Sequence, residues 1–287
     1  MTLIKSISGI RGVFGHTLNK EIATSYSISF AQNQPKGTIL LSRDTRPHGI
    51  VLYNSIIKSL SINGFNVLDC GIIPTPTAQF IIKEKKISGG IVITASHNPI
   101  EWNGLKFLDS DGCFLNSDKM NTLLKYTPIK KKSKIGKVIT LENPYESHIN
   151  NVLQLNCINT KIIKEKKIKV VVDTVNGAAY KALPIFLQNL NCEVIKIYCD
   201  NDGTFPRGTE PIPSHLEHLS NMVIKHNADI GFATDPDADR LAIVDNKGIP
   251  IGEELTLILA VESYLKYYRN KQTIVTNLST SMGVDAI

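Results

Sequence analysis

The sequence predicts an α/β protein made of two tandem mixed-sheet units and the start of a third. A length of 287 residues exceeds the usual size of one domain. Short β-rich runs alternate with helical patterns, and polar loops directly follow several of these runs. We place the first unit at residues 1–145, the second at 146–249 and a truncated start of the third at 250–287.

The first unit shows strand-like runs separated by helical patterns. The expected strands are residues 37–41, 65–68 and 90–94, and helices are expected over residues 50–62 and from the turn at 74–76 to about residue 85. A turn signal at Asp109–Gly112 lies between the apolar runs 105–108 and 113–115. This pattern predicts a hairpin after the loop that contains Ser96.

The second unit repeats this arrangement. A helix over residues 142–155 leads to it. Its expected strands are 168–173, 193–198, 229–234 and 241–245. One helix is expected to end near residue 190, and another is expected over 213–225. A helix at 252–268 and a strand at 273–277 follow, and another helix would begin at residues 281–287. Because one strand and one helix cannot bury both faces of a sheet, we expect the third unit to be incomplete.

The composition narrows the class of protein. The segment at the N-terminus lacks a signal-peptide pattern and no apolar run is long enough to cross a bilayer, so we expect a cytoplasmic protein without a membrane partner. Five scattered cysteines, without a C-x-x-C pair, argue against a disulfide framework or a zinc site. The net charge of +6 comes partly from lysine clusters without interleaved aromatic residues, which favours a solvated surface over a nucleic-acid groove.

Three aspartates at alternate positions follow the apolar run 229–234. Asp235, Asp237 and Asp239 can point toward one centre if the loop stays extended, and Pro236 favours that conformation. Three carboxylates so close repel one another unless a cation neutralises them. Oxygen ligands alone favour Mg²⁺, Mn²⁺ or Ca²⁺, so the loop is a candidate metal site, with an exposed acidic turn as the alternative.

Ser96 occupies the matching place in the first unit, at the end of the run 90–94. His97 beside it suggests a serine hydrolase, but adjacent residues on a tight turn rarely form a nucleophile and base pair, and no GxSxG elbow is present. A serine close to a divalent cation is better suited to carry a phosphoryl group. By itself, however, a serine in this position is more often just a turn residue.

Four segments together resemble the α-D-phosphohexomutase family, which includes phosphoglucomutase, phosphomannomutase and phosphoglucosamine mutase. They are Ser8–Gly12, Thr94–Pro99, Asn103–Phe107 and Asp235–Arg240, in this order. The resemblance runs from Ile4 to the end of the chain. It implies tandem α/β domains of the phosphohexomutase type and an isomerase that moves a phosphoryl group between the 1- and 6-positions of a hexose phosphate.

The resemblance also implies a role for individual residues. Ser96 would be the phosphorylated serine, and its phosphate would join Asp235, Asp237 and Asp239 around one Mg²⁺. The implied substrate is a sugar phosphate, with a hexose 1,6-bisphosphate as intermediate and activator.

Four further residues complete the implied site. Arg11 and Arg240 would hold the charge of the transferred group, and two guanidinium groups suit that task. Lys106 matches the lysine that the family uses near the transferred proton. His97 would orient or neutralise the phosphoserine, although a structural hydrogen bond explains it equally well.

The chain departs from the family in its extent. Complete members have four domains, whereas this sequence contains the first two and the beginning of the third. The sugar-recognition loop of the third domain and the phosphate-binding loop of the fourth are not present, so the substrate and the activity of this chain stay open. A non-catalytic sugar-phosphate-binding remnant is therefore an alternative to a mutase.

Two other classes of protein are weaker alternatives. A magnesium phosphatase of the haloacid-dehalogenase type would place paired aspartates after a strand, as Asp235 and Asp237 are, but Asp239 stands where that motif has Thr or Val. Nucleic-acid binding would require more than the net positive charge. The oligomeric state is not predicted.

Overall fold

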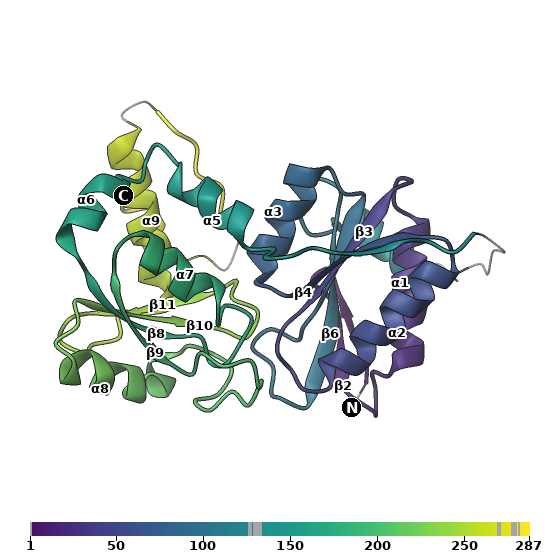
Figure 1. Cartoon of the computed structure of the whole chain (residues 1–287), viewed down its shortest axis with the longest axis horizontal. Coiled ribbons are helices and arrows are strands. Elements are labelled where there is room, and N and C mark those ends of the chain that lie inside the picture. Colours follow the sequence, from purple (N-terminus) through teal and green to yellow (C-terminus); the bar gives the residue numbers. More distant parts are fainter. Residues whose placement is uncertain (1, 126–127, 129–133, 269–270, 277–279, 281) are drawn as a thin grey trace.

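The computed structural model describes residues 2–125, 128, 134–268, 271–276, 280 and 282–287. Two α/β units lie side by side, each built around its own sheet, and helix α5 lies on the segment that joins them (Figure 1). Both sheets contain parallel and antiparallel pairs, which confirms the predicted tandem mixed-sheet class. Most of the lysine-rich segment near residue 130 lies outside the described residues.

The first unit is a three-layer α/β/α sandwich. Its sheet has the order β1-β2-β6-β5-β3-β4-β7 among the described residues. The strands are β1 (Ile4–Ser6), β2 (Gly9–Val13), β3 (Thr38–Arg43), β4 (Asn66–Ile72), β5 (Gly89–Ile93), β6 (Trp102–Leu108) and β7 (Val138–Thr140). The helices are α1 (Lys20–Gln32), α2 (Gly49–Ile62), α3 (Thr75–Lys85) and α4 (Ser117–Lys125).

Alternating side chains of the first sheet form its two cores. Leu41 of β3 packs in a cluster with residues of α1, α2 and α4, whereas its neighbour Leu40 packs with α3. The same alternation separates Ile91 and Ile93 from Val92. Because successive strand residues point to opposite faces, the apolar run of β5 is buried on both sides and its carboxyl end is held firmly.

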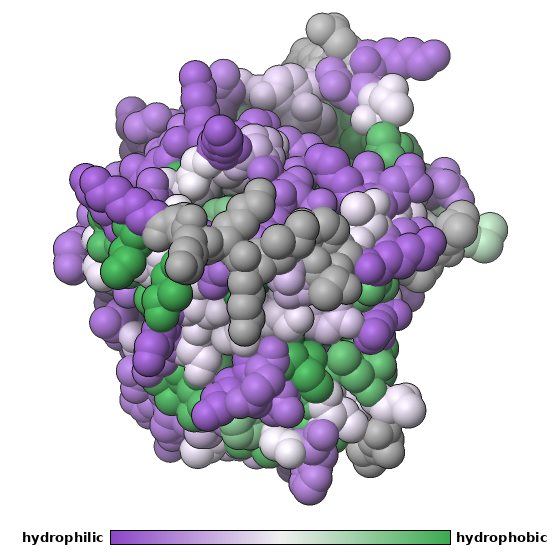
Figure 2. All heavy atoms as spheres, turned by 90° about the vertical axis from the view of Figure 1, so that its right-hand side faces the viewer, coloured by the Kyte–Doolittle hydropathy of each residue, from purple (hydrophilic) through white to green (hydrophobic). Residues whose placement is uncertain are grey.

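The face of the first unit that is turned away from the second unit carries helices α1 and α2. Figure 2 shows that hydrophilic side chains dominate this face and that apolar side chains lie in separate patches. Ile50 and Val51 of α2 are among the exposed apolar residues. Single exposed apolar residues of this kind are normal on a soluble surface.

The second unit is a smaller α/β/α sandwich. Its sheet has the order β11-β10-β8-β9 among the described residues. The strands are β8 (Lys169–Asp173), β9 (Glu193–Ile197), β10 (Ile230–Thr234) and β11 (Leu241–Val244), and the helices are α5 (Glu146–Leu153), α6 (Thr160–Lys166), α7 (Ala182–Asn189) and α8 (Glu217–Lys225). Helices α7 and α8 pack on opposite faces of this sheet.

Most predicted strands are present, but one expected strand is absent. The turn predicted at Asp109–Gly112 is present, since the Gly112 N–H donates to the carbonyl oxygen of Asp109 at 3.0 Å. The segment after it returns antiparallel to the end of β6 through the bridge Leu108–Phe114 and the hydrogen bond from the Leu115 N–H to the carbonyl oxygen of Phe107, whereas the main partners of β6 are β5 and β2, both antiparallel. Of the expected strand 273–277, the described residues 273–276 form no strand and pair with none of the strands in the described part of the chain.

Helix α9 (Glu253–Tyr267) confirms the helix expected after the second unit. It packs beside β11, and Val261 is its buried apolar residue, whereas Leu255, Leu257 and Leu259 are each more than two-fifths exposed. A 3₁₀ turn at Met282–Val284 stands where another helix was expected to begin. Within the described part of the chain, no helix combines the length and the apolar composition that crossing a membrane requires.

Direct hydrogen bonds and close backbone approaches join the two units. The Thr45 hydroxyl donates to the carbonyl oxygen of Asn176 at 2.6 Å, and the Thr75 N–H donates to the carbonyl oxygen of Asp237 at 2.8 Å. A Cβ at Gly203, where φ is +65°, would lie 2.3 Å from the carbonyl oxygen of Thr45. The loops at the carboxyl ends of β3 and β4 therefore meet the loops that follow β8, β9 and β10 at close range, and the candidate site lies where the two units meet.

We expect Gly104→Ala to lower the unfolding temperature of the first unit. A Cβ at Gly104 would lie 2.5 Å from the carbonyl oxygen of Ile10 and 2.7 Å from that of Thr94, so neighbouring backbone must move. Overpacking of this kind costs about 1–3 kcal/mol. Gly49→Ala is the control, because its Cβ would meet no atom closer than 3.5 Å. Equal unfolding temperatures for the two variants in calorimetry would contradict this packing.

Candidate active site

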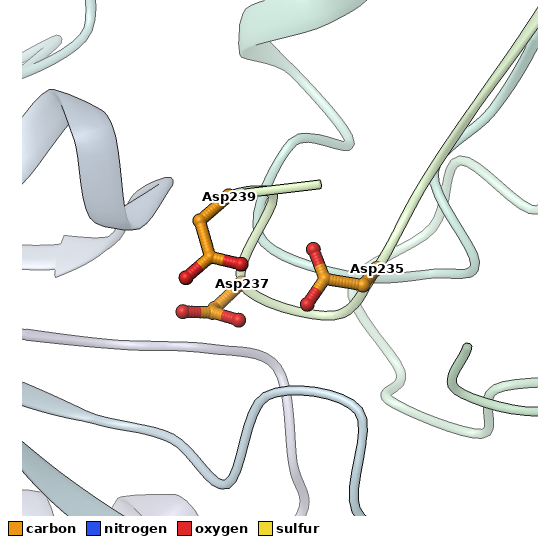
Figure 3. A group of neighbouring side chains, drawn as sticks. All are labelled: Asp235, Asp237 and Asp239. Carbon is orange, nitrogen blue, oxygen red and sulfur yellow. The ribbon is translucent and has the colours of Figure 1, made fainter. Parts of the chain in front are cut away.

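The acidic loop, residues 235–240, connects the antiparallel strands β10 and β11. Thr234 pairs with Leu241, so the loop begins and ends at one point of the sheet edge. Figure 3 shows the carboxylates of Asp235, Asp237 and Asp239 turned toward one another, and one oxygen from each lies within 4.8 Å of the others. The sequence reasoning that grouped these three residues thus agrees with their positions.

The turn after β8, which contains Gly177 and Ala178, packs against the acidic loop. The N–H of Ala178 donates to the carbonyl oxygen of Pro236 at 2.7 Å. A Cβ at Gly177 would lie 2.7 Å from the same oxygen, so only glycine permits this approach. Ala238 has a φ of +56°, a left-handed conformation that costs energy for alanine. The loop is therefore held in a conformation that its own residues do not favour.

Burial makes the acidic loop a strong candidate for a bound cation. Asp235 and Asp237 are fully buried, while the side chain of Asp239 is 30% exposed. Among the described residues, the Oδ1 atom of Asp237 has no hydrogen-bond partner although it is buried. A buried carboxylate oxygen without a donor is costly, and a divalent cation would satisfy it. The donor set is all oxygen, which fits Mg²⁺, Mn²⁺ or Ca²⁺.

Lys106 of β6 reaches the acidic loop from the first unit. Its Nζ lies 2.6 Å from Asp237 Oδ2 and 2.7 Å from Asp239 Oδ2. Burial alone would lower the pKa of Lys106, but the two carboxylates outweigh burial and raise this pKa above its ordinary value. Lys106 is therefore an ammonium at neutral pH, and it supplies the positive charge that the buried carboxylates require.

The two buried aspartates differ in charge. Burial and the neighbouring carboxylates raise the pKa of Asp235 well above its ordinary value. Burial has the same tendency at Asp237, but the Lys106 ion pair and hydrogen bonds, including one from the Thr75 hydroxyl, lower its pKa overall. In the absence of a metal, Asp235 therefore has the greater tendency to hold a proton.

The serine loop, residues 94–101, connects β5 to β6 in the first unit. Ser96 is only 3% exposed and has a φ of +50°, which is unusual for a residue other than glycine. Its N–H donates to the Thr94 hydroxyl at 2.8 Å, and its Oγ donates to Asp235 Oδ2 at 3.0 Å. The serine hydroxyl thus points directly at the acidic loop of the other unit.

Arg11, His97 and Arg240 border the same cavity. It has a volume of about 270 Å³ and is lined by Ile7, Ser8, Arg11, Ser96, His97, Lys106, Phe114, Asp239 and Arg240. Arg11 Nη1 donates to Asn98 Oδ1 at 2.9 Å, and Arg240 Nη1 donates to Glu210 Oε1 at 2.8 Å. The structure therefore brings together all the candidate residues, and the mouth of the site is lined with guanidinium groups that suit an anion.

His97 lies beside Ser96 but is poorly placed as its base. The distance from His97 Nδ1 to Ser96 Oγ is 3.5 Å, the outer limit of a hydrogen bond. Burial, reinforced by the charge of Arg240, lowers the pKa of His97, which favours a neutral imidazole. The Thr209 hydroxyl donates to the backbone carbonyl of His97, so a second-unit loop also holds this residue.

The sequence reasoning missed two residues, Asp44 and Arg46. Both are fully buried, and they form an ion pair with 3.1 Å between Arg46 Nε and Asp44 Oδ2. Burial raises the pKa of Asp44, although its pairing with Arg46 opposes that effect. Their position in a polar loop after β3 could have indicated that they lie near Ser96, because β3 runs parallel to β5 and neighbouring parallel strands end at the same edge of a sheet.

The fold and the site together define a tandem α/β protein in which a buried serine faces an acidic loop across two units. Two family models match it: "Phosphoglucomutase/phosphomannomutase, alpha/beta/alpha domain I" over residues 3–134 and "Phosphoglucomutase/phosphomannomutase, alpha/beta/alpha domain II" over residues 144–248. The chain belongs to the α-D-phosphohexomutase family and corresponds to its N-terminal portion. Both models describe domains of phosphoglucomutase/phosphomannomutase proteins.

Curated relatives carry two kinds of mutase name. The chain is 34% identical to the phosphoglucosamine mutase of Nautilia profundicola, over 96% of this chain and 62% of that protein. It is 32% identical to the phosphoglucomutase/phosphomannomutase of Thermococcus kodakarensis, over 97% of this chain and 63% of that protein. The chain therefore spans about three fifths of the length of these relatives.

A solved structure has the same fold. The phosphoglucomutase/phosphomannomutase family protein from Burkholderia thailandensis superposes with a TM-score of 0.76 at 27% identity, over 92% of this chain and 60% of that one. The similarity thus extends through both units.

We expect Asp235→Asn to raise the unfolding temperature of the metal-free protein at pH 8. Because the pKa of Asp235 is raised on folding, the folded chain binds this proton more tightly than the unfolded chain does. The resulting stabilisation is present below the ordinary aspartate pKa of about 4 and is lost as the pH rises through the raised pKa. A neutral amide avoids that loss, so its advantage should be largest at pH 8.

Thermal unfolding with a chelator between pH 4 and pH 8 measures this effect. Asp118→Asn serves as the control, because Asp118 is exposed in the first turn of α4. A stabilisation by Asp235→Asn that is larger at pH 4 than at pH 8 would contradict a raised pKa of Asp235 in the folded chain.

Proposed function

We propose that the protein performs the phosphoryl transfer of a hexose phosphate mutase, with Ser96 as the carrier of the phosphoryl group and Mg²⁺ held by Asp235, Asp237 and Asp239. The observation that supports this most directly is the 3.0 Å contact between Ser96 Oγ and Asp235 Oδ2 across the two units. At this distance a phosphate on Ser96 would complete the oxygen ligands of the acidic loop, which supports the proposal.

The proposed reaction interconverts a hexose 1-phosphate and a hexose 6-phosphate. The P–O bond to Ser96 breaks while a P–O bond to the sugar hydroxyl forms, which gives a hexose 1,6-bisphosphate. The other phosphate of this intermediate then returns to Ser96. When bound, Mg²⁺ would neutralise charge on the transferred group.

The residues of this chain would divide the remaining tasks. Arg11 and Arg240 face the cavity beside Ser96 and would bind the phosphoryl oxygens. Lys106 Nζ would be the proton carrier: as the neutral amine it would accept the proton of the attacking sugar hydroxyl, and as the ammonium, the form that its raised pKa favours, it would donate a proton in the reverse direction. His97, neutral in this environment, would donate a hydrogen bond rather than carry a charge.

The substrate is proposed only as a class. The relatives are named for glucosamine, glucose and mannose phosphates, so a hexose or hexosamine phosphate is the class that the comparisons support. Because the chain spans about three fifths of those relatives, the step that its own residues support is phosphoryl exchange between Ser96 and a hexose bisphosphate. A non-catalytic protein that binds sugar phosphates is the alternative.

Incubation with Mg²⁺ and glucose 1,6-bisphosphate should add one phosphoryl group to Ser96, detected by intact and peptide mass spectrometry. Ser96→Ala should abolish the label, and Asp237→Asn should reduce the rate of labelling by about 100-fold or more because it removes a charged ligand. Ser110→Ala, an exposed serine in the turn after β6, is the matched control and should be labelled like the native chain.

Two results would count against the proposal. Binding of the bisphosphate without any label on Ser96 would support the non-catalytic alternative. A label that appears on Asp235 in the Ser96→Ala variant would support phosphatase-like chemistry at the acidic loop.

A further inference from the structure

Arg46 is the residue that connects most of the serine loop. All five N–H groups of its guanidinium have an acceptor. Nε donates to Asp44 Oδ2 at 3.1 Å, Nη1 donates to the carbonyl oxygens of Pro99 at 2.6 Å and Trp102 at 3.1 Å, and Nη2 donates to those of Ser96 and Asn98, both at 2.7 Å. A guanidinium has no further donors, so its hydrogen bonding is complete.

We propose that Arg46 is a positioning residue that holds Ser96 in its reactive orientation, and that the second unit completes this support through Phe205. The inference rests on the proposed phosphoryl transfer at Ser96. Arg46 lines no part of the cavity and lies on the carbonyl side of the serine loop, so it acts through the loop and not on the ligand.

The serine loop requires such support because its backbone is strained. A φ of +50° at Ser96 is a strained conformation for a residue other than glycine, and it persists only where the surroundings enforce it. Arg46 fixes the carbonyl of Ser96, and Asp44 fixes the N–H of the same residue through Thr94. The Thr94 hydroxyl donates to Asp44 Oδ2 at 2.7 Å and accepts the Ser96 N–H at 2.8 Å.

The second unit closes over the guanidinium. The ring of Phe205 lies with its centroid 5.0 Å from Arg46 Cζ, within the range of a cation–π contact. Phe205 itself has a φ of +50°, and Gly203 approaches the backbone of Thr45 closely. Residues of the second unit therefore contact Arg46 and its neighbour Thr45 directly, which links the geometry of Ser96 to the docking of the two units.

Lysine cannot replace this arginine. An ammonium has three donors on one atom, whereas the four carbonyl oxygens and the carboxylate surround a planar fork. Arg46→Lys therefore keeps the charge and the fold-stabilising burial but leaves carbonyl groups of the serine loop without a donor. Arg43→Lys is the matched control: Arg43 lies in the same segment, and its Nη1 donates to the carbonyl oxygen of Asp44 at 2.9 Å.

The experiment measures two quantities on the full chain. Amide hydrogen exchange of the serine loop reports its geometry without any reaction, because the N–H groups of Ser96, Asn98 and Trp102 are hydrogen-bonded. We expect Arg46→Lys to accelerate this exchange by about 10-fold, the effect of losing roughly one hydrogen bond. We expect Arg43→Lys to leave it unchanged.

The second quantity is the rate of Ser96 labelling by glucose 1,6-bisphosphate with Mg²⁺. In Arg46→Lys the rate at saturating bisphosphate should fall by about 100-fold, because small misplacements of a reacting group have effects of that size. The half-saturating concentration should stay the same, since Arg46 does not line the cavity. If Arg46 only stabilised the fold, its replacement would lower the unfolding temperature but would not lower the saturating rate at an unchanged half-saturating concentration.

Phe205→Leu is the second variant, and it should produce smaller changes in the same direction even if Arg46→Lys does not fold. The inference is overturned if exchange of the serine loop is native-like in the folded Arg46 and Phe205 variants, or if both are labelled at the native rate. Absence of label on the native chain would instead overturn the proposed function, and the exchange measurement would still decide the role of Arg46.

Discussion

The burial of two carboxylates beside a third is the constraint on which the rest of the structure depends. Asp235 and Asp237 are fully buried in one short loop with Asp239, an arrangement that is unfavourable without compensating positive charge. The first unit supplies a positive charge through Lys106, whose Nζ lies 2.6 Å from Asp237 and 2.7 Å from Asp239, so the docking of the two units stabilises the acidic loop.

The mixed topology of the first sheet explains how the residues converge. Strands β3 and β5 run parallel, and their carboxyl ends place Arg46 and Ser96 at one edge. Strand β6 returns antiparallel beside β5, and Lys106 lies on it near the same edge. Strand β2 then pairs with β6 and brings Arg11 alongside Gly104. The antiparallel pairing of β5 and β6 therefore allows Ser96, which follows β5, and Lys106, which lies on β6, to reach the same site.

Local signals in the sequence predicted the strand ends and therefore most of the site. Ser96 and the three aspartates directly follow buried strands, so apolar patterning located them, and the family resemblance added Arg11 and Lys106. Arg46 was missed because the carbonyl groups that it binds in Ser96 and Asn98 are 50 and 52 residues away, which side-chain identity does not reveal. Strand β2 was missed because its pairing with β6 is also long-range. The strand expected at 273–277 failed for the opposite reason: its local propensity was sufficient, but in residues 271–276 it has no partner strand.

The separation of the interacting residues along the chain has a consequence for folding. Ser96 and Asp235 are 139 positions apart and Lys106 and Asp237 are 131 apart, whereas each sheet closes largely through contacts within its own unit. Closing long loops is entropically costly, so contacts of this kind form after the local ones. The first unit can leave the ribosome and form its sheet before the acidic loop has been synthesised. Until the second unit arrives, the nascent chain therefore holds Lys106 and Arg46 uncovered, and the site is assembled last.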